Sequence, residues 1–208
     1  SWRPTVYAEN HPEDGKELGT VDVPDVVALN YKVPHLDELR ALLPDLKLMN
    51  SEHSNANTGE RFIKEGEGGN DWHDDELWQT DKILHDLDEF AKREWIAGSA
   101  LWCMHDYGTE YGVSRPIQMS GCIDAWRFPK LVAHAIRARW NDTPFTRILG
   151  HWTWPGQEGA EKRIGVASNA DRVELVLNGT SLGVKTRADA TRLGYYVWTV
   201  PYAPGTLH

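Results

Sequence analysis

The stretch "DVVALNYKVPHLDELRALLPDLKLMNSEH", residues 25–53, decides the fold class because its periodicity changes twice. It opens on an apolar run rich in Val and Ala and closes on a second apolar run, and both runs predict strands. Between them, Leu36, Leu39 and Leu43 recur at helical spacing until Pro44 ends the helix. A strand, a helix and a further strand in such short succession indicate a parallel α/β sheet or barrel.

The alternation of strand and helix continues on both sides of this stretch. Strands are expected over residues 4–9, 25–31, 46–52 and 96–103, and helices over residues 35–43, 79–95 and 128–140. The small apolar residues of the last of these strands predict that it is fully buried. Thr80 or Asp81 is the expected N-cap of the second helix, and Pro129 marks the expected start of the third.

The pattern becomes all-β after Trp140. A connection rich in Pro and Gly, residues 141–163, leads into expected β structure over residues 163–186 and 195–200, with Asn178-Gly179 as a strong hairpin signal. This unit of roughly 65 residues falls short of the ~100 residues of an immunoglobulin-like sandwich, so it is expected to be truncated. The chain is therefore expected to hold an α/β domain over residues 1–142 and a linker with a partial β-sandwich over residues 143–208.

The amino-acid composition makes some classes of binding partner less favourable than others. The net charge of −9 disfavours nucleic acid and anionic membrane surfaces, because both bind clustered Lys and Arg. No stretch approaches the roughly 18 apolar residues of a membrane span, and Cys103 and Cys122 are too few for a disulfide framework or a Cys-rich zinc site. The 10 Trp against 4 Phe favour a sugar partner, since an indole offers a flat apolar face and one N–H donor; the alternative is that they are core residues.

Polar and aromatic side chains gather where the expected strands end. They are Asn30, Tyr31, Ser51, Glu52, His53, Trp102, His105, Asp106 and Tyr107. In a barrel, successive strand ends converge on one pocket. A Tyr hydroxyl beside Glu52 would hold its carboxylate ionised and oriented, as a nucleophile requires. The alternative is that these are ordinary polar residues at strand-to-loop junctions.

Seven motifs in order carry a family resemblance. They are "DVVALNY", "MNSEH", "GSALWCMHDYGTEYG", "CIDAWRFPK", "HWTWPG", "SNADRVELVLNG" and "SLG". Together they resemble the C-terminal part of a glycoside hydrolase family 2 enzyme, the family of β-galactosidases, β-glucuronidases and β-mannosidases. The resemblance implies the C-terminal half of a (β/α)₈ TIM barrel, a linker and the start of an immunoglobulin-like β-sandwich domain.

The resemblance also implies roles for individual residues. Glu52 matches the catalytic nucleophile and Tyr31 the tyrosine that hydrogen-bonds it. The expected substrate-binding residues are Asn30, His53, Trp102, His105, Asp106, Glu110 and Trp72. His53 departs from the aromatic or small residue that often follows the nucleophile in the family, which puts the local subsite in doubt.

The implied chemistry is retaining hydrolysis, in which one carboxylate attacks the anomeric carbon and a second carboxyl protonates the leaving oxygen. In the family the second group is the Glu of an Asn-Glu pair, and this chain has no such pair. The acid/base is therefore expected upstream of Ser1, and the isolated chain is expected to be inactive and marginally stable. Any signal peptide would also lie upstream, and a secreted or periplasmic location is favoured.

A terminal β-galactoside is the expected substrate. The Asn-Lys pair that glucuronidases of the family carry is missing, so β-glucuronides and β-mannosides rank behind it. No organic cofactor is implied, and the sequence leaves a homo-oligomer open. Two other hypotheses are a non-catalytic carbohydrate-binding module and a metal-dependent hydrolase. The second would use the acidic run at residues 71–75, which as a close run is more typical of a solvated loop than of metal ligands.

Overall fold

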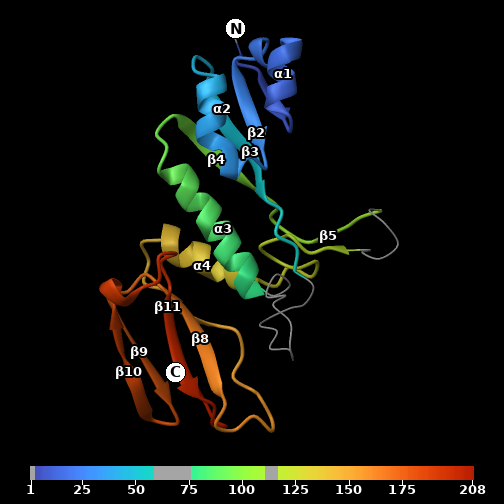
Figure 1. Ribbon diagram of the computed structural model, residues 1–208. Helices are drawn as coiled ribbons and strands as arrows, with labels where there is room; N and C mark the ends of the chain where they lie inside the picture. Colours follow the sequence, from blue (N-terminus) through green and yellow to red (C-terminus); the bar gives the residue numbers. More distant parts are fainter. Residues whose placement is uncertain (1–2, 59–75, 111–116) are drawn as a thin grey trace. The chain divides into compact units, whose positions relative to one another are not determined.

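The computed structural model describes residues 3–58, 76–110 and 117–208. These form a mixed α/β protein built mostly of β-sheets (Figure 1). By their internal contacts, the residues divide into two compact units, one of residues 1–57 and 82–121 and the other of residues 58–81 and 122–208. The division falls within helix α3 (Glu76–Ala91). The expected domain boundary after residue 142 stays a prediction.

The first unit is organised by a four-stranded, all-parallel sheet. Its strands, in spatial order, are β1 (Val6–Glu9), β2 (Val26–Asn30), β3 (Leu48–Ser54) and β4 (Ile96–Trp102). The four expected strands are confirmed, with ends that differ by up to two residues. Because all four run in one direction, their carboxyl ends meet at one edge of the sheet, where the polar side chains of the motifs lie.

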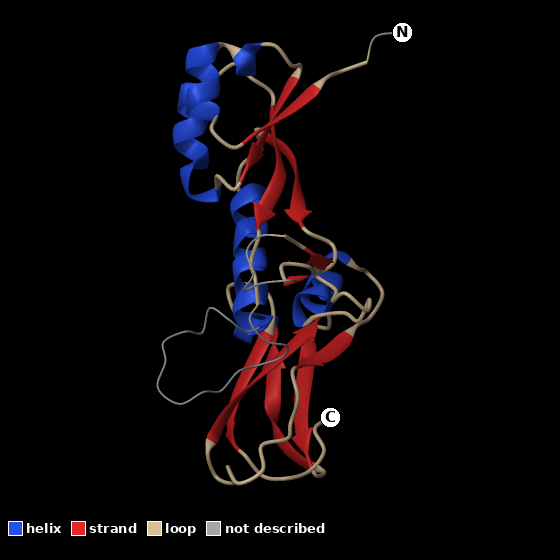
Figure 2. Ribbon diagram, turned by 90° about the vertical axis from the view of Figure 1, so that its right-hand side faces the viewer, coloured by secondary structure: helices blue, strands red, loops and turns tan. Residues whose placement is uncertain are grey.

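Helices cover one side of this sheet, as Figure 2 shows. The short helices of the unit are α1 (Pro12–Leu18), η1 (Thr20–Asp22), η2 (Val33–His35) and α2 (Leu36–Leu42). The core between helices and strands consists of Val21, Val27, Leu29, Val33, Leu36, Leu39, Leu43, Leu48 and Phe90. Helix α1, which contains Gly15, was not among the expected elements. A Cβ on that residue would lie 2.9 Å from Val21 Cγ1, so close packing explains this glycine.

The expectation that the strand at 96–103 is fully buried is wrong. Residues 97–100 of β4 are exposed, although β2 is buried along most of its length. Among the described strands, β4 pairs only with β3, so it forms an edge of the sheet. A run of small apolar residues predicts a strand, but it does not reveal whether that strand has neighbours on both sides.

The second unit is antiparallel in its β part. Its elements are α4 (Leu131–Trp140), β7 (Thr146–Leu149), β8 (Glu161–Ser168), β9 (Arg172–Leu177), β10 (Thr180–Thr186), η4 (Arg187–Asp189) and β11 (Tyr196–Pro201). One sheet has the order β11-β8-β7 and the other pairs β10 with β9, on opposite sides in Figure 1. Side chains from both sheets share the core of Ile164, Val166, Val173, Leu175, Tyr196, Trp198 and Val200.

Two expected helix starts are corrected, and one strand was not expected. Helix α3 begins at Glu76, so Thr80 and Asp81 lie inside the helix and are not its N-cap; the Thr80 hydroxyl donates to the Glu76 carbonyl at 2.7 Å. Helix α4 begins after Pro129, where a Glu76 carboxylate oxygen accepts the Leu131 N–H at 2.8 Å. A cap supplied by a residue so far away leaves no local sequence signal. Strand β7 also lies within the expected irregular connection.

Candidate active site

The central feature of the sheet's carboxyl edge is a hydrogen bond between Tyr31 and Glu52. The Tyr31 hydroxyl donates to Glu52 Oε2, and the Tyr31 backbone N–H donates to the Glu52 carbonyl at 2.9 Å. Tyr31 directly follows β2 and has a left-handed φ of 53°. Partial burial of the phenol, with the hydrogen bond and charge of Glu52, raises the pKa of Tyr31 above its usual value. The phenol therefore stays protonated and acts as a donor to the carboxylate.

A bulge in β3 determines where Glu52 lies. Leu29 pairs with Asn50, but the next residue, Asn30, pairs with Glu52, so β3 holds one extra residue. Side chains replace the interrupted ladder: Ser51 Oγ donates to Asn30 Oδ1 at 2.5 Å. The buried Asn50 amide donates to the Leu29 carbonyl at 2.7 Å and to the Glu52 carbonyl at 3.0 Å. Bulges of this kind re-aim side chains next to active sites, and Asn30 thereby acts in positioning β3.

His53 lies in a different environment from Glu52, because successive residues of a strand point to opposite faces. Its side chain is fully buried, and its ring meets the Phe90 ring edge-on at 5.1 Å between centroids. Burial, with a smaller contribution from Lys82, lowers the pKa of His53 to about 4, against the opposing effect of Asp86. The expected substrate contact of His53 is therefore not part of the site that we propose below.

The segment after β4 brings a second phenol to this edge. The Trp102 indole N–H donates to the Tyr107 hydroxyl at 3.2 Å, and the two rings meet edge-to-face at 6.0 Å. The peptide between Trp102 and Cys103 is cis. Tyr107 and Cys103 are close enough to add to the increase in the pKa of Tyr31. Tyr107 was among the polar and aromatic residues expected at the strand ends, but no role was predicted for it.

Asp106 is used to close a loop. It is buried, and its Oδ1 accepts the Gly121 N–H at 2.8 Å. A Cβ on Gly121 would lie 2.3 Å from the Asp106 backbone nitrogen, so only glycine allows this approach. His105 Nδ1 lies 3.2 Å from the Asp106 carbonyl oxygen, and Glu110 is exposed on the same segment. Asp106 thus shapes the loop through its backbone partner, and its expected contact with the sugar stays a prediction.

Other expectations fall outside the described residues. Trp72 and the acidic run at residues 71–75 lie there, as does the expected metal alternative. Within residues 3–58, 76–110 and 117–208, no three His, Cys, Asp or Glu side chains are arranged to hold a metal ion. The helices of this same part are all too short or too polar to cross a membrane.

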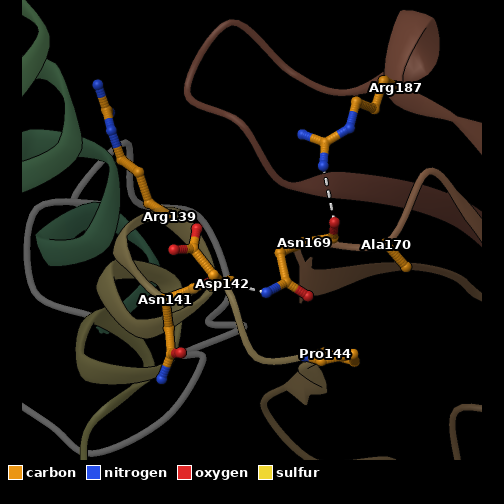
Figure 3. Close-up of a pocket in the computed structure, with 8 residues that line it drawn as sticks. Arg139, Asn141, Asp142, Pro144, Asn169, Ala170 and Arg187 are labelled. Carbon is orange, nitrogen blue, oxygen red and sulfur yellow. Dashed lines mark hydrogen bonds between the residues drawn. The ribbon is translucent and has the colours of Figure 1, made fainter.

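A cavity of about 360 Å³ lies in the second unit, and none of the residues that line it is an expected site residue (Figure 3). Its polar lining is largely engaged in holding the chain: the Asn169 amide donates to the carbonyls of Asn141 and Thr143, both at 2.7 Å. Arg187 donates to the Asn169 carbonyl at 2.7 Å and to Asp171 at 2.8 Å. These contacts fix the connection from α4 to β7 and give no sign of catalysis.

The fold recurs in solved glycosidase structures. A β-glucuronidase of Bacteroides uniformis, solved in covalent complex with a cyclophellitol-6-carboxylate aziridine, superposes with a TM-score of 0.82 at 21% identity. The match covers 97% of this chain and 26% of that protein. At 21% identity, this match shows only that the two proteins share a fold.

Sequence relatives narrow the class further. A β-galactosidase of Bacteroides ovatus is 28% identical over 234 residues, covering 99% of this chain and 26% of that protein. A β-glucuronidase of Formosa agariphila is 30% identical over 108 residues, covering 50% of this chain and 11% of that protein. Residues 159–208 match a family model described as a domain of unknown function, DUF4982. These relatives confirm the resemblance to glycoside hydrolase family 2, although the chain spans about a quarter or less of the length of either.

Proposed function

We propose that this chain carries the nucleophile of a retaining β-glycosidase, with Glu52 as the attacking carboxylate and Tyr31 as the residue that orients it. The single observation that carries the proposal is the hydrogen bond from the Tyr31 hydroxyl to Glu52 Oε2 at the carboxyl edge of a parallel sheet. A nucleophile must be ionised and held in one orientation, and a neutral phenol donor provides both.

The reaction would proceed in two displacements. Tyr31 holds Oε2, and Oε1 is the oxygen that we assign to attack on the anomeric carbon. The bond from that carbon to Glu52 forms as the bond to the leaving oxygen breaks, and the acid/base carboxyl gives that oxygen its proton. Water, deprotonated by the same group, then displaces Glu52 and restores the configuration. Trp102 and Tyr107, joined by their own hydrogen bond, would line the sugar subsite beside the nucleophile.

The architecture that we infer is the C-terminal half of a (β/α)₈ barrel followed by a partial immunoglobulin-like sandwich, with the boundary after residue 142. The parallel sheet of β1 to β4 with helices on one side supports the first part. The two antiparallel sheets around a shared core support the second. In such barrels the active site lies at the carboxyl ends of the strands, which agrees with the position of Glu52.

For the substrate we propose a terminal β-D-galactoside, with a β-glucuronide as the alternative and a β-mannoside behind it. A sequence relative that covers 99% of this chain is named a β-galactosidase, whereas a shorter sequence match and a solved structure that matches 97% of the chain are named β-glucuronidases. A glucuronide site requires donors for the sugar carboxylate, and Arg or amide side chains supply them best.

The proposal is tested by covalent trapping in the full-length protein. Separate samples are incubated with the 2-deoxy-2-fluoro-β-glycosyl fluorides of galactose, glucuronic acid and mannose, and the peptides are analysed by mass spectrometry. The activated fluoride leaves with little help from an acid, so the reagents report mainly on the nucleophile. We expect a fluorogalactosyl adduct on Glu52 and no adduct in the Glu52→Gln variant.

The outcomes separate the parts of the proposal. An adduct from the glucuronyl or mannosyl reagent at Glu52 would keep the mechanism and change the sugar. An adduct on another residue would refute the assignment of Glu52. Absence of any adduct, together with unchanged sugar binding in Glu52→Gln, would support a carbohydrate-binding module instead of an enzyme.

A further inference from the structure

The end of β3 leaves strand geometry two residues after the proposed nucleophile. Ser54 has a φ of 72° and Asn55 a φ of 35°, so both adopt the left-handed conformation although neither is glycine. This conformation costs free energy for a residue with a Cβ, and it persists only where surrounding contacts determine it. The contacts that hold this turn therefore also hold the strand end that carries Glu52.

The first contact comes from helix α3. Ser54 Oγ donates to Asp86 Oδ2 at 2.8 Å, and His53 Nδ1 lies 2.7 Å from the same hydroxyl oxygen. Because the Ser54 proton is directed to Asp86, His53 Nδ1–H is the donor in the second hydrogen bond. A chain of three side chains thus runs from the residue after Glu52 to a carboxylate on the neighbouring helix.

Asp86 is a fixed anchor for this chain. Only 1% of its surface is exposed, and Lys82, one helical turn earlier, donates to it. His85 Nδ1 lies 3.3 Å from its second oxygen. These partners offset the cost of burying the carboxylate. The anchor is therefore satisfied within its own helix and does not depend on Ser54 to remain in place.

The second contact comes from the segment after β4. Gln118 Nε2 donates to Asn55 Oδ1 at 2.9 Å, and the Met119 N–H donates to Asn57 Oδ1 at 3.0 Å. These two residues belong to or follow β6 (Ile117–Gln118), which pairs with β5 (Tyr107–Gly108). The turn is therefore held on one side by α3 and on the other by this hairpin.

We propose that Asp86 is a positioning residue for Glu52 and acts through Ser54 by fixing the turn that ends β3. Without this anchor the turn relaxes towards ordinary strand geometry, and Glu52 moves relative to the Tyr31 hydroxyl. The inference rests on the proposed function, because it requires Glu52 to be the nucleophile. Asp86 touches neither substrate nor reacting atoms in this scheme.

The test compares Asp86→Asn and Ser54→Gly in the full-length protein. Glycine accepts the left-handed φ of Ser54 without strain, so Ser54→Gly removes the hydroxyl while it preserves the backbone conformation. Labelling of Glu52 by the fluoroglycosyl fluoride that labels the wild type is followed over a range of reagent concentrations. We expect the maximal labelling rate to fall about 10-fold in both variants and the half-saturating concentration to stay within about 2-fold, as a small displacement of the attacking group predicts.

Two further measurements distinguish positioning from stability alone. Asp37→Asn is the matched control, because it removes a carboxylate of α2 that pairs with Arg93, two residues beyond the end of α3, without touching β3. It should label at the wild-type rate. The second measurement combines Asp86→Asn with Tyr31→Phe. If both residues act on the orientation of Glu52, the fold-losses of the single variants will not multiply in the double variant.

The possible failures are distinguishable. If the wild type is labelled at Glu52 and both variants label at its rate, the inference is overturned while the proposed function stands. Losses in the double variant that multiply would also overturn it, since Asp86 would then act independently of the Tyr31–Glu52 contact. If no reagent labels the wild type, the proposed function fails first and the inference fails with it.

Discussion

Two turns in this protein adopt the same backbone conformation and hold it by different means. In the β9–β10 hairpin, Asn178 and Gly179 have φ of 51° and 81°; at the end of β3, Ser54 and Asn55 have φ of 72° and 35°. Asn-Gly adopts left-handed geometry at little cost and fits a two-residue hairpin. The turn at Ser54 instead depends on side chains supplied by α3 and β6. The hairpin is thus encoded locally, whereas the β3 turn is encoded by residues far away in the sequence.

The largest expected effect concerns Glu52, the proposed nucleophile near the end of β3, and is measured as a loss of turnover. Replacement of Glu52 by Ala should lower kcat by about 100,000-fold, because no covalent intermediate can form. Added azide should restore turnover and yield the α-glycosyl azide, since azide enters the space left by the carboxylate on the face opposite the leaving group. Nuclear magnetic resonance of the product identifies its anomeric configuration.

An exposed carboxylate on β9, beside the hairpin, provides the control for this variant. Glu174→Ala removes the same group from a surface position and should leave kcat at the wild-type value. A β-configured azide product from Glu52→Ala would assign the acid/base role to Glu52 and contradict the nucleophile.

The comparison also explains which features the sequence could predict. Leu36, Leu39 and Leu43 predicted α2, and Asn178-Gly179 predicted the hairpin, because periodicity and turn chemistry are local. The pairing of Tyr31 with Glu52 could be proposed because both residues end expected parallel strands. The bulge opposite Leu29, the Ser54–Asp86 contact and the Glu76 cap on Leu131 could not be predicted, because each joins residues more than 20 positions apart.

One local hint of the β3 anchor does exist in the sequence. Ile83, Leu87 and Phe90 form the apolar stripe of α3, and Asp86 lies beside it at a buried position. A carboxylate there requires partners, so its presence indicates a polar contact across the helix. The sequence alone does not say which residue makes that contact.

An effect of intermediate size concerns His53, which lies in β3 beside the turn at Ser54. It makes the free energy of unfolding depend on pH, and the hairpin at Asn178-Gly179 has no counterpart of it. The pKa of His53 falls from the ordinary 6.5 to about 4 in the folded protein. Between these values the unfolded chain binds the additional proton, so the free energy of unfolding should decrease as the pH falls from 6.5 towards 4. This one group contributes at most about 3 kcal/mol over the window. His53→Gln should remove that part of the slope.

Urea denaturation of the wild type and His53→Gln at several pH values measures this contribution. The difference in unfolding free energy between the two proteins should depend on pH within the window and become constant above pH 7. Parallel curves from pH 4 to 7 would show that His53 does not become protonated on unfolding, and would contradict its burial as a neutral ring.

The smallest expected effect concerns the hairpin itself. A Cβ on Gly179 would meet no atom within 4 Å, so Gly179→Ala tests the left-handed φ of 81° without any steric clash. We expect a loss of about 1–2 kcal/mol in local stability, and a smaller loss for Gly179→Asn, since Asn tolerates this conformation. Hydrogen exchange of the peptide over residues 172–186 measures both, while the labelling rate of Glu52 should remain unchanged. Equal losses for Ala and Asn would mean that the presence of a side chain, and not the left-handed backbone conformation, destabilises this turn. The hairpin and the turn at Ser54 could then no longer be compared by their backbone conformation.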